Sequence, residues 1–125
     1  MTAKINITVG TISIEAEMLN TLTATRIFES LPLEGSANVW GDEIYFEIPL
    51  TLESEPEARA DVEVGDLAYW PAGSAFCIFF GPTPVSTGSE PRAYSPVNVF
   101  GRVRGDARQF TGVASGAPVK VTRVE

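Results

Sequence analysis

Histidine is absent from this 125-residue chain, and its absence removes several kinds of active site at once. There can be no Ser-His-Asp triad, no His-ligated zinc and no imidazole base working near neutral pH. Cysteine is nearly absent as well, and the single Cys77 excludes an internal disulfide. Because Cys77 lies between Phe76 and Ile78, we interpret it as a small buried apolar side chain rather than a reactive thiol.

Basic residues are also few. Nine Lys and Arg stand against sixteen Asp and Glu, which gives a net charge of −7. Nucleic acids and anionic membrane surfaces both attract basic patches, so we expect neither as a partner. The longest apolar run, residues 75–80, is far too short to cross a bilayer, and residues 1–10 lack the apolar core of a signal peptide. The cytoplasm is therefore the expected compartment.

Residues 51–63 carry five carboxylates and few large apolar groups. We interpret this segment as a solvated loop or strand edge, because crowded carboxylates repel one another unless an ion is present. A metal site here is the less favoured alternative, and we expect neither a metal nor a cofactor. The length and ordinary composition of the chain predict a single domain over residues 1–125.

Alternating apolar and polar residues predict a β-hairpin over residues 4–16. The pair Gly10-Thr11 suits a two-residue type II′ turn, which would place Val9 opposite Ile12. In that register the apolar side chains of both strands lie on one face of the sheet.

The rest of the chain predicts more strands and little helix. One helix is expected over residues 21–31, where apolar residues recur at helical spacing and Pro32 follows. Further strands are expected within 36–50 (with a kink at Gly41-Asp42), 67–70, 75–80, 97–103 and 119–124, and a short helical turn within 106–114. Residues 81–96, rich in Gly, Pro and Ser, predict a long irregular loop. About eight strands with few helices favour a closed β-barrel or a sandwich.

Residues 65–84 hold five of the twelve aromatic residues and should anchor the core. Within them, residues 75–80 are apolar on both alternating faces, which predicts a strand buried on both sides. Prolines stiffen the two ends, Tyr69-Trp70-Pro71 and Gly81-Pro82-Thr83-Pro84, which we expect to form the rims of a groove.

Several segments of the chain carry motifs that resemble those of a known family. Residues 99–103, VFGRV, resemble a cyclophilin motif, and Gly116-x-Pro118-Val119 resembles the turn before the last cyclophilin strand. WGDEIYF (40–46), GDLAYWPAG (65–73) and FFGPTP (79–84) resemble a family of short prokaryotic cyclophilin-like proteins without an assigned activity. The resemblance implies a mainly β fold, a closed and roughly eight-stranded cyclophilin-like barrel with one helix in the N-terminal half and one short C-terminal helical turn.

The isomerase residues of true cyclophilins are not found at the matching positions. Those enzymes carry a Phe-His-Arg strand, whose arginine approaches the prolyl nitrogen, and a Gln-Gly-Gly segment, whereas residues 39–47 here contain neither. Rotation about a prolyl amide crosses a barrier of roughly 18–20 kcal/mol, and lowering it calls for a donor or cation at the nitrogen. Arg92 is the one arginine expected near the groove, and a solvated surface position is its simpler interpretation. Enzymatic activity stays open, and its absence is favoured.

We favour a binding protein that holds a small molecule or a peptide segment in an aromatic groove. The candidate ligand-binding residues are Glu43, Tyr45, Tyr69, Trp70, Phe80, Thr83 and Asn98. Structural alternatives stay open for them, such as core packing for Tyr69 and Trp70 and internal hydrogen bonds for Thr83 and Asn98. Two other functions also stay open: a divergent peptidyl-prolyl isomerase, and a structural or homo-oligomerising β-protein.

Overall fold

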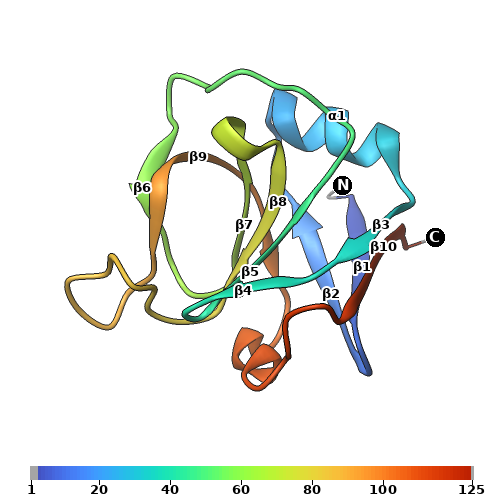
Figure 1. Cartoon of the computed structure of the whole chain (residues 1–125). Helices are drawn as coiled ribbons and strands as arrows, with labels where there is room; N and C mark the ends of the chain where they lie inside the picture. The colour runs from blue at the N-terminus through green and yellow to red at the C-terminus, as the bar shows by residue number, and fades with distance from the viewer. Residues whose placement is uncertain (1–2, 125) are drawn as a thin grey trace.

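A ten-stranded β-sheet with one α-helix forms the fold of the computed structural model, which describes residues 3–124 (Figure 1). The strands are β1 (Lys4–Val9), β2 (Ile12–Met18), β3 (Leu33–Ser36), β4 (Asn38–Trp40), β5 (Glu43–Glu47), β6 (Arg59–Asp61), β7 (Asp66–Trp70), β8 (Ala75–Phe79), β9 (Arg92–Val103) and β10 (Pro118–Arg123). Their order in the sheet is β3-β10-β1-β2-β9-β7-β8-β5-β4, and β6 pairs with β9 beside this path. The expected mainly β fold with one helix is confirmed.

The expected closed barrel of about eight strands is wrong in its closure and its strand count. Within residues 3–124 the end strands β3 and β4 are not paired with each other. They follow one another in the chain, separated only by the buried Ala37. The Ala37 N–H donates to the Ala117 carbonyl, and the Ala37 carbonyl accepts from the Gly116 N–H. The chain thus pairs with β10 before Ala37, as β3, and with β5 after it, as β4. Because no ladder joins β3 to β4, the curved sheet stays open.

The first hairpin has the predicted register. Val9 lies opposite Ile12 and Ile7 opposite Ile14 in the antiparallel pair β1–β2. Gly10 has a φ of +61°, a conformation that glycine supplies without steric cost. Ile7, Val9 and Ile14 are all buried in the interior, as the shared apolar face predicts.

Helix α1 (Leu22–Ser30) lies where a helix was expected and covers one end of the sheet (Figure 1). The Thr21 hydroxyl caps it by accepting from the Ala24 N–H at 3.0 Å. Two short 3₁₀ turns, η1 (Pro71–Gly73) and η2 (Ala107–Phe110), complete the helical elements, and η2 lies within the predicted helical turn. No helix in the described part of the chain is long and apolar enough to cross a bilayer.

The sheet separates two apolar clusters, and β8 contributes to both. Phe76 and Ile78 belong to the large interior cluster, whereas Ala75, Cys77 and Phe79 belong to a smaller cluster on the outer face. All five residues of β8 are buried, which confirms a strand covered on both sides. Cys77 is buried as predicted.

Two local predictions were wrong. Gly41-Asp42 is not a kink but the two-residue turn of the β4–β5 hairpin. The irregular loop is shorter than residues 81–96, because β9 begins at Arg92 and contains Pro96. Pairing with β6 imposes the extended conformation there. The irregular register of this pair suits a proline, which has no N–H to give to a ladder.

Candidate functional site

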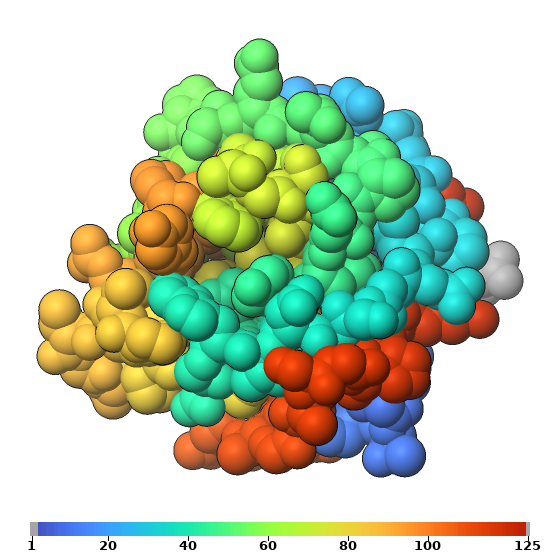
Figure 2. Space-filling view, viewed as in Figure 1, coloured from blue at the N-terminus to red at the C-terminus, as the bar shows by residue number. Residues whose placement is uncertain are grey.

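A cleft lies on the outer face of the sheet, where four strands present aromatic side chains. Its volume is about 160 Å³, and it is lined by Trp40, Glu43, Tyr45, Trp70, Ala93, Tyr94 and Val97. In the space-filling view the surface is hollowed between the orange part of β9, the yellow-green end of β7 and the teal β4–β5 hairpin (Figure 2).

The β4–β5 hairpin places three of the lining residues. Trp40 pairs directly with Glu43 across the turn, and the strand period of two puts Tyr45 on the same face as Glu43. The tip is fixed by the neighbouring loop, since the Asp42 N–H donates to the Pro82 carbonyl and the Asp42 carbonyl accepts from the Phe80 N–H, both at 2.9 Å. The two motifs WGDEIYF and FFGPTP therefore meet in space.

Small side chains beneath the rings leave room for the cleft. Tyr45 lies opposite Cys77 in the β5–β8 register, and Trp70 lies opposite Ala75 in the β7–β8 register. Ala68, Ala75 and Cys77 all belong to the outer cluster, and Tyr45 and Trp70 pack against that cluster. Large rings standing over small residues leave a hollow that bulkier side chains would fill.

The four rings contact one another edge to face, a favoured geometry for aromatic pairs. Tyr94 lies between the two tryptophans, with its ring centroid 6.1 Å from that of Trp40 and 6.1 Å from that of Trp70. The ring centroids of Trp70 and Tyr45 are 6.3 Å apart. The Trp70 indole N–H donates to the Ser95 hydroxyl at 2.6 Å, which orients this ring. The rings form adjoining walls set steeply to one another.

Among the residues that the structure describes, Glu43 is the only charged one in the lining, and it is 5% exposed. Burial raises the pKa of its carboxyl from 4.5 to about 7, and a hydrogen bond with the Cys77 side chain offsets part of this effect. Burial, together with the neighbouring Glu43, raises the pKa of the Cys77 thiol well above its ordinary value, so this thiol stays protonated. The cleft thus combines apolar ring faces with one carboxyl group that titrates near neutral pH.

A larger hollow, of about 900 Å³, lies between α1 and the end of β2. Its charged lining residues are Glu17, Glu29 and Arg102, and Phe28 is its only ring. It contains none of the candidate ligand-binding residues predicted from the sequence. We therefore place the candidate site at the outer cleft, where aromatic walls and a buried carboxyl group converge.

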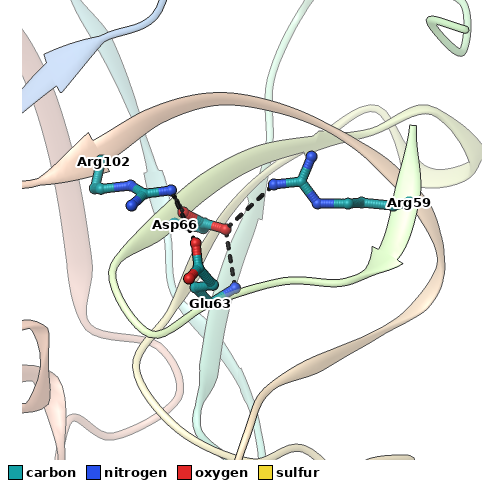
Figure 3. Close-up of polar contacts among 4 residues, drawn as sticks. All are labelled: Arg59, Glu63, Asp66 and Arg102. Carbon is teal, nitrogen blue, oxygen red and sulfur yellow. Dashed lines mark hydrogen bonds and ion pairs between the residues drawn. The ribbon is translucent and has the colours of Figure 1, made fainter. Parts of the chain in front are cut away.

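A second buried carboxylate, Asp66, serves the fold (Figure 3). It is fully buried at the start of β7, where its Oδ2 accepts from the Glu63 N–H at 2.9 Å. Arg102 Nη2 lies 3.0 Å from Asp66 Oδ1 and Arg59 Nη2 lies 3.9 Å from Oδ2. Burial raises the pKa of Asp66, while the Glu63 N–H and the two arginines oppose that rise. These contacts tie β7 to β6 and β9.

The structure brings Glu43, Tyr45 and Trp70 together and places the other four candidates elsewhere. Tyr69 points into the interior, because neighbours in a strand face opposite sides, and its hydroxyl donates to the Leu50 carbonyl at 2.7 Å. Phe80 lies in the same interior cluster against Phe110.

Thr83 and Asn98 are buried and bonded to backbone. The Thr83 hydroxyl, in the 81–91 loop, donates to the carbonyl of Arg92 at the start of β9. Asn98 accepts from the Glu55 N–H at 2.9 Å and donates to the Glu53 carbonyl at 2.9 Å, so it fastens the acidic loop to β9. Within residues 3–124 the acidic residues of that loop form no cluster suited to a metal ion.

Trp40 and Tyr94 line the cleft although they were not among the predicted site residues. A two-residue Gly-Asp link between apolar-alternating segments is a hairpin signal, and it would have placed Trp40 opposite Glu43. Tyr94 had no comparable signal, because the residues around it are typical of a loop.

Comparison with known proteins agrees with this fold. The cyclophilin-like family matches residues 3–122. The solution structure of a hypothetical protein from Archaeoglobus fulgidus is similar, with a TM-score of 0.82 and 38% sequence identity over 98% of this chain and 95% of that one. A comparison with curated proteins found no match. The chain belongs to the cyclophilin-like family.

Proposed function

We propose that this protein binds a small molecule or a peptide segment in the outer cleft. One observation carries the proposal: four aromatic rings from four different strands converge on one hollow that also contains a buried carboxyl group. The contacting residues in this proposal are Trp40, Glu43, Tyr45, Trp70 and Tyr94. Tyr69, Phe80, Thr83 and Asn98 would support the fold around it.

Incomplete burial distinguishes these rings from core residues. Tyr94 is 73% exposed, and Trp40, Tyr45 and Trp70 are each partly exposed, whereas Phe46, Phe76, Phe79 and Phe100 are fully buried. Solvated ring faces around a concave surface are typical of a binding site, because a ligand that covers them removes apolar area from water.

The isomerase alternative has less support. Among the described residues no arginine or lysine lines the cleft, and Arg92, the arginine expected near the groove from the sequence, pairs with Asp61 at 3.2 Å. A prolyl ring could enter an aromatic cleft, but the cation that would assist rotation about the amide bond is not among the lining side chains. Proline-isomerisation activity well above the uncatalysed rate, measured on an Ala-Pro peptide, would restore this alternative.

Tryptophan fluorescence provides a direct test, because both tryptophans of the chain line the cleft. Peptides and metabolites that raise the melting temperature should also change the tryptophan emission. Tyr94→Ala should weaken these responses, while Leu22→Ala, at another exposed apolar residue outside the cleft, should not. A broad screen in which stabilising compounds leave the emission unchanged would refute the proposal. Dimerisation that alters the emission without any ligand would favour the oligomerising alternative.

A further inference from the structure

We propose that the cleft recognises an alkylated ammonium group, with the four rings surrounding the cation and Glu43 supplying the opposite charge. This inference rests on the proposed function and names its ligand class. The same chemistry occurs in free quaternary ammonium compounds and in a methylated lysine side chain of a peptide.

The carboxylate is the first element of the argument. Glu43 is buried, yet no ion pair to it is formed in the part of the chain that the structure describes. The arginines of β6 and β9 have other partners: Arg92 pairs with Asp61, and Arg59 and Arg102 pair with Asp66. A buried carboxylate without a cationic partner is costly, and a ligand that brings a positive charge would remove that cost.

The rings are the second element. A cation over the face of a tryptophan or tyrosine is attracted by the negative face of the ring. Here Tyr94 joins the two tryptophans, at interplanar angles of 71° and 78°, and Tyr45 meets Trp70 at 75°. Rings set so steeply to one another can offer walls to a single cation from several directions, as in aromatic cages that bind methylated amines.

Size and hydrogen bonding favour an alkylated group over a bare one. The volume of about 160 Å³ is below the roughly 300–1,000 Å³ of sites for drug-sized ligands, so one compact head group suits it. An unmodified ammonium has three N–H donors to satisfy, and ring faces are poor replacements for acceptors. Alkylation removes those donors and leaves charge and apolar surface. The net charge of −7 would also attract cations to the protein.

Calorimetric titration with choline and with 3,3-dimethylbutan-1-ol, a neutral compound of the same shape, separates charge from shape. Choline should bind about tenfold more tightly than the neutral compound, or better. This is the ratio expected from a cation–π contribution near the middle of its range. A short peptide with one trimethyllysine should bind more tightly than the same peptide with unmodified lysine. Comparing the trimethyllysine peptide with choline then distinguishes a peptide ligand from a free small molecule. Tighter binding of this peptide than of choline would identify a peptide partner, and the reverse a free small molecule.

Glu43→Gln should weaken choline binding about tenfold or more and leave binding of the neutral compound unchanged. Glu47→Gln is the matched control, because Glu47 lies four residues after Glu43 on the same strand, is exposed and does not line the cleft. Circular dichroism would verify that both variants fold.

Equal affinity for the charged and neutral compounds would overturn the inference while the proposed binding cleft stands. Absence of binding by both choline and the trimethyllysine peptide would also overturn it. Failure of the proposed function itself would give a different result: no compound in the ligand screen would change the tryptophan emission.

Discussion

Trp40 and Glu43 lie directly opposite each other across the β4–β5 turn, so one short hairpin supplies both a wall of the cleft and its only charge. The hairpin is held at its tip by the loop that follows β8. The geometry of the cleft therefore depends on a contact between two segments about forty residues apart in sequence, and several measurements follow from it.

Gly41→Ala should destabilise the protein by about 2–4 kcal/mol. Gly41 has a φ of +58°, and a Cβ there would lie 2.8 Å from Pro84 Cδ and 2.9 Å from Thr83 Cα. The substitution would push the hairpin away from the loop. Urea unfolding measures the effect, and Gly88→Ala is the control, since a Cβ at Gly88 has nothing within 4 Å. Equal stability of the two variants would contradict the tip contact.

The free energy of unfolding should fall as pH rises from about 4.5 to 7, because folded Glu43 keeps its proton over a range where unfolded Glu43 has lost it. The pKa difference corresponds to about 3 kcal/mol, reached above pH 7. Cys77, which faces Glu43 from β8, stays protonated throughout this range because its pKa is raised.

Glu43→Gln should remove this part of the pH dependence, while Glu47→Gln should keep it. Urea unfolding at pH 5 and pH 8 for both variants gives the comparison. Parallel profiles for the wild type and Glu43→Gln would show that Glu43 is not shifted by burial.

Tyr69→Phe should lower stability by about 1–3 kcal/mol. The Tyr69 hydroxyl donates to the Leu50 carbonyl and accepts from the Leu52 N–H at 3.0 Å, and both partners lose this bond in the variant. Hydrogen exchange at the Leu52 amide should quicken. The fluorescence response to a cleft ligand should be unchanged. Loss of this response in a folded variant would indicate that Tyr69 contributes to ligand binding.

Arg102→Leu should cost roughly 2–4 kcal/mol at neutral pH, because it leaves the fully buried Asp66 with fewer opposite charges. Arg104→Leu is the matched control: its ion pair with Glu17, at 3.3 Å, joins two half-exposed side chains and should contribute at most about 1 kcal/mol. Similar losses in both variants would contradict the structural role of Asp66.

Local rules account for the elements that the sequence predicted well. The Gly10-Thr11 hairpin and the helix ended by Pro32 depend on neighbours in the chain, and both were found as expected. The open sheet was not predictable in this way, because the change of pairing partner at Ala37 depends on where the distant strands β10 and β5 lie.

The candidate site was predicted only in part, because it also combines local patterns with contacts between distant strands. Three of the predicted residues, Glu43, Tyr45 and Trp70, do meet in the cleft. Strand alternation alone shows that the neighbours Tyr69 and Trp70 cannot both line one cleft, but it does not say which of them faces the interior. Tyr94 could not have been placed, because its segment becomes a strand only by pairing with β6.

The most direct test of the central claim is a ¹⁵N–¹H correlation spectrum of the protein with and without a compound that stabilises it. Only two indole N–H signals exist, from Trp40 and Trp70, and both tryptophans line the cleft. We predict that both signals and the Tyr94 amide move on titration, while amides around Thr25 in α1 stay in place. Movement confined to the hollow between α1 and β2, with both indole signals unchanged, would contradict the account.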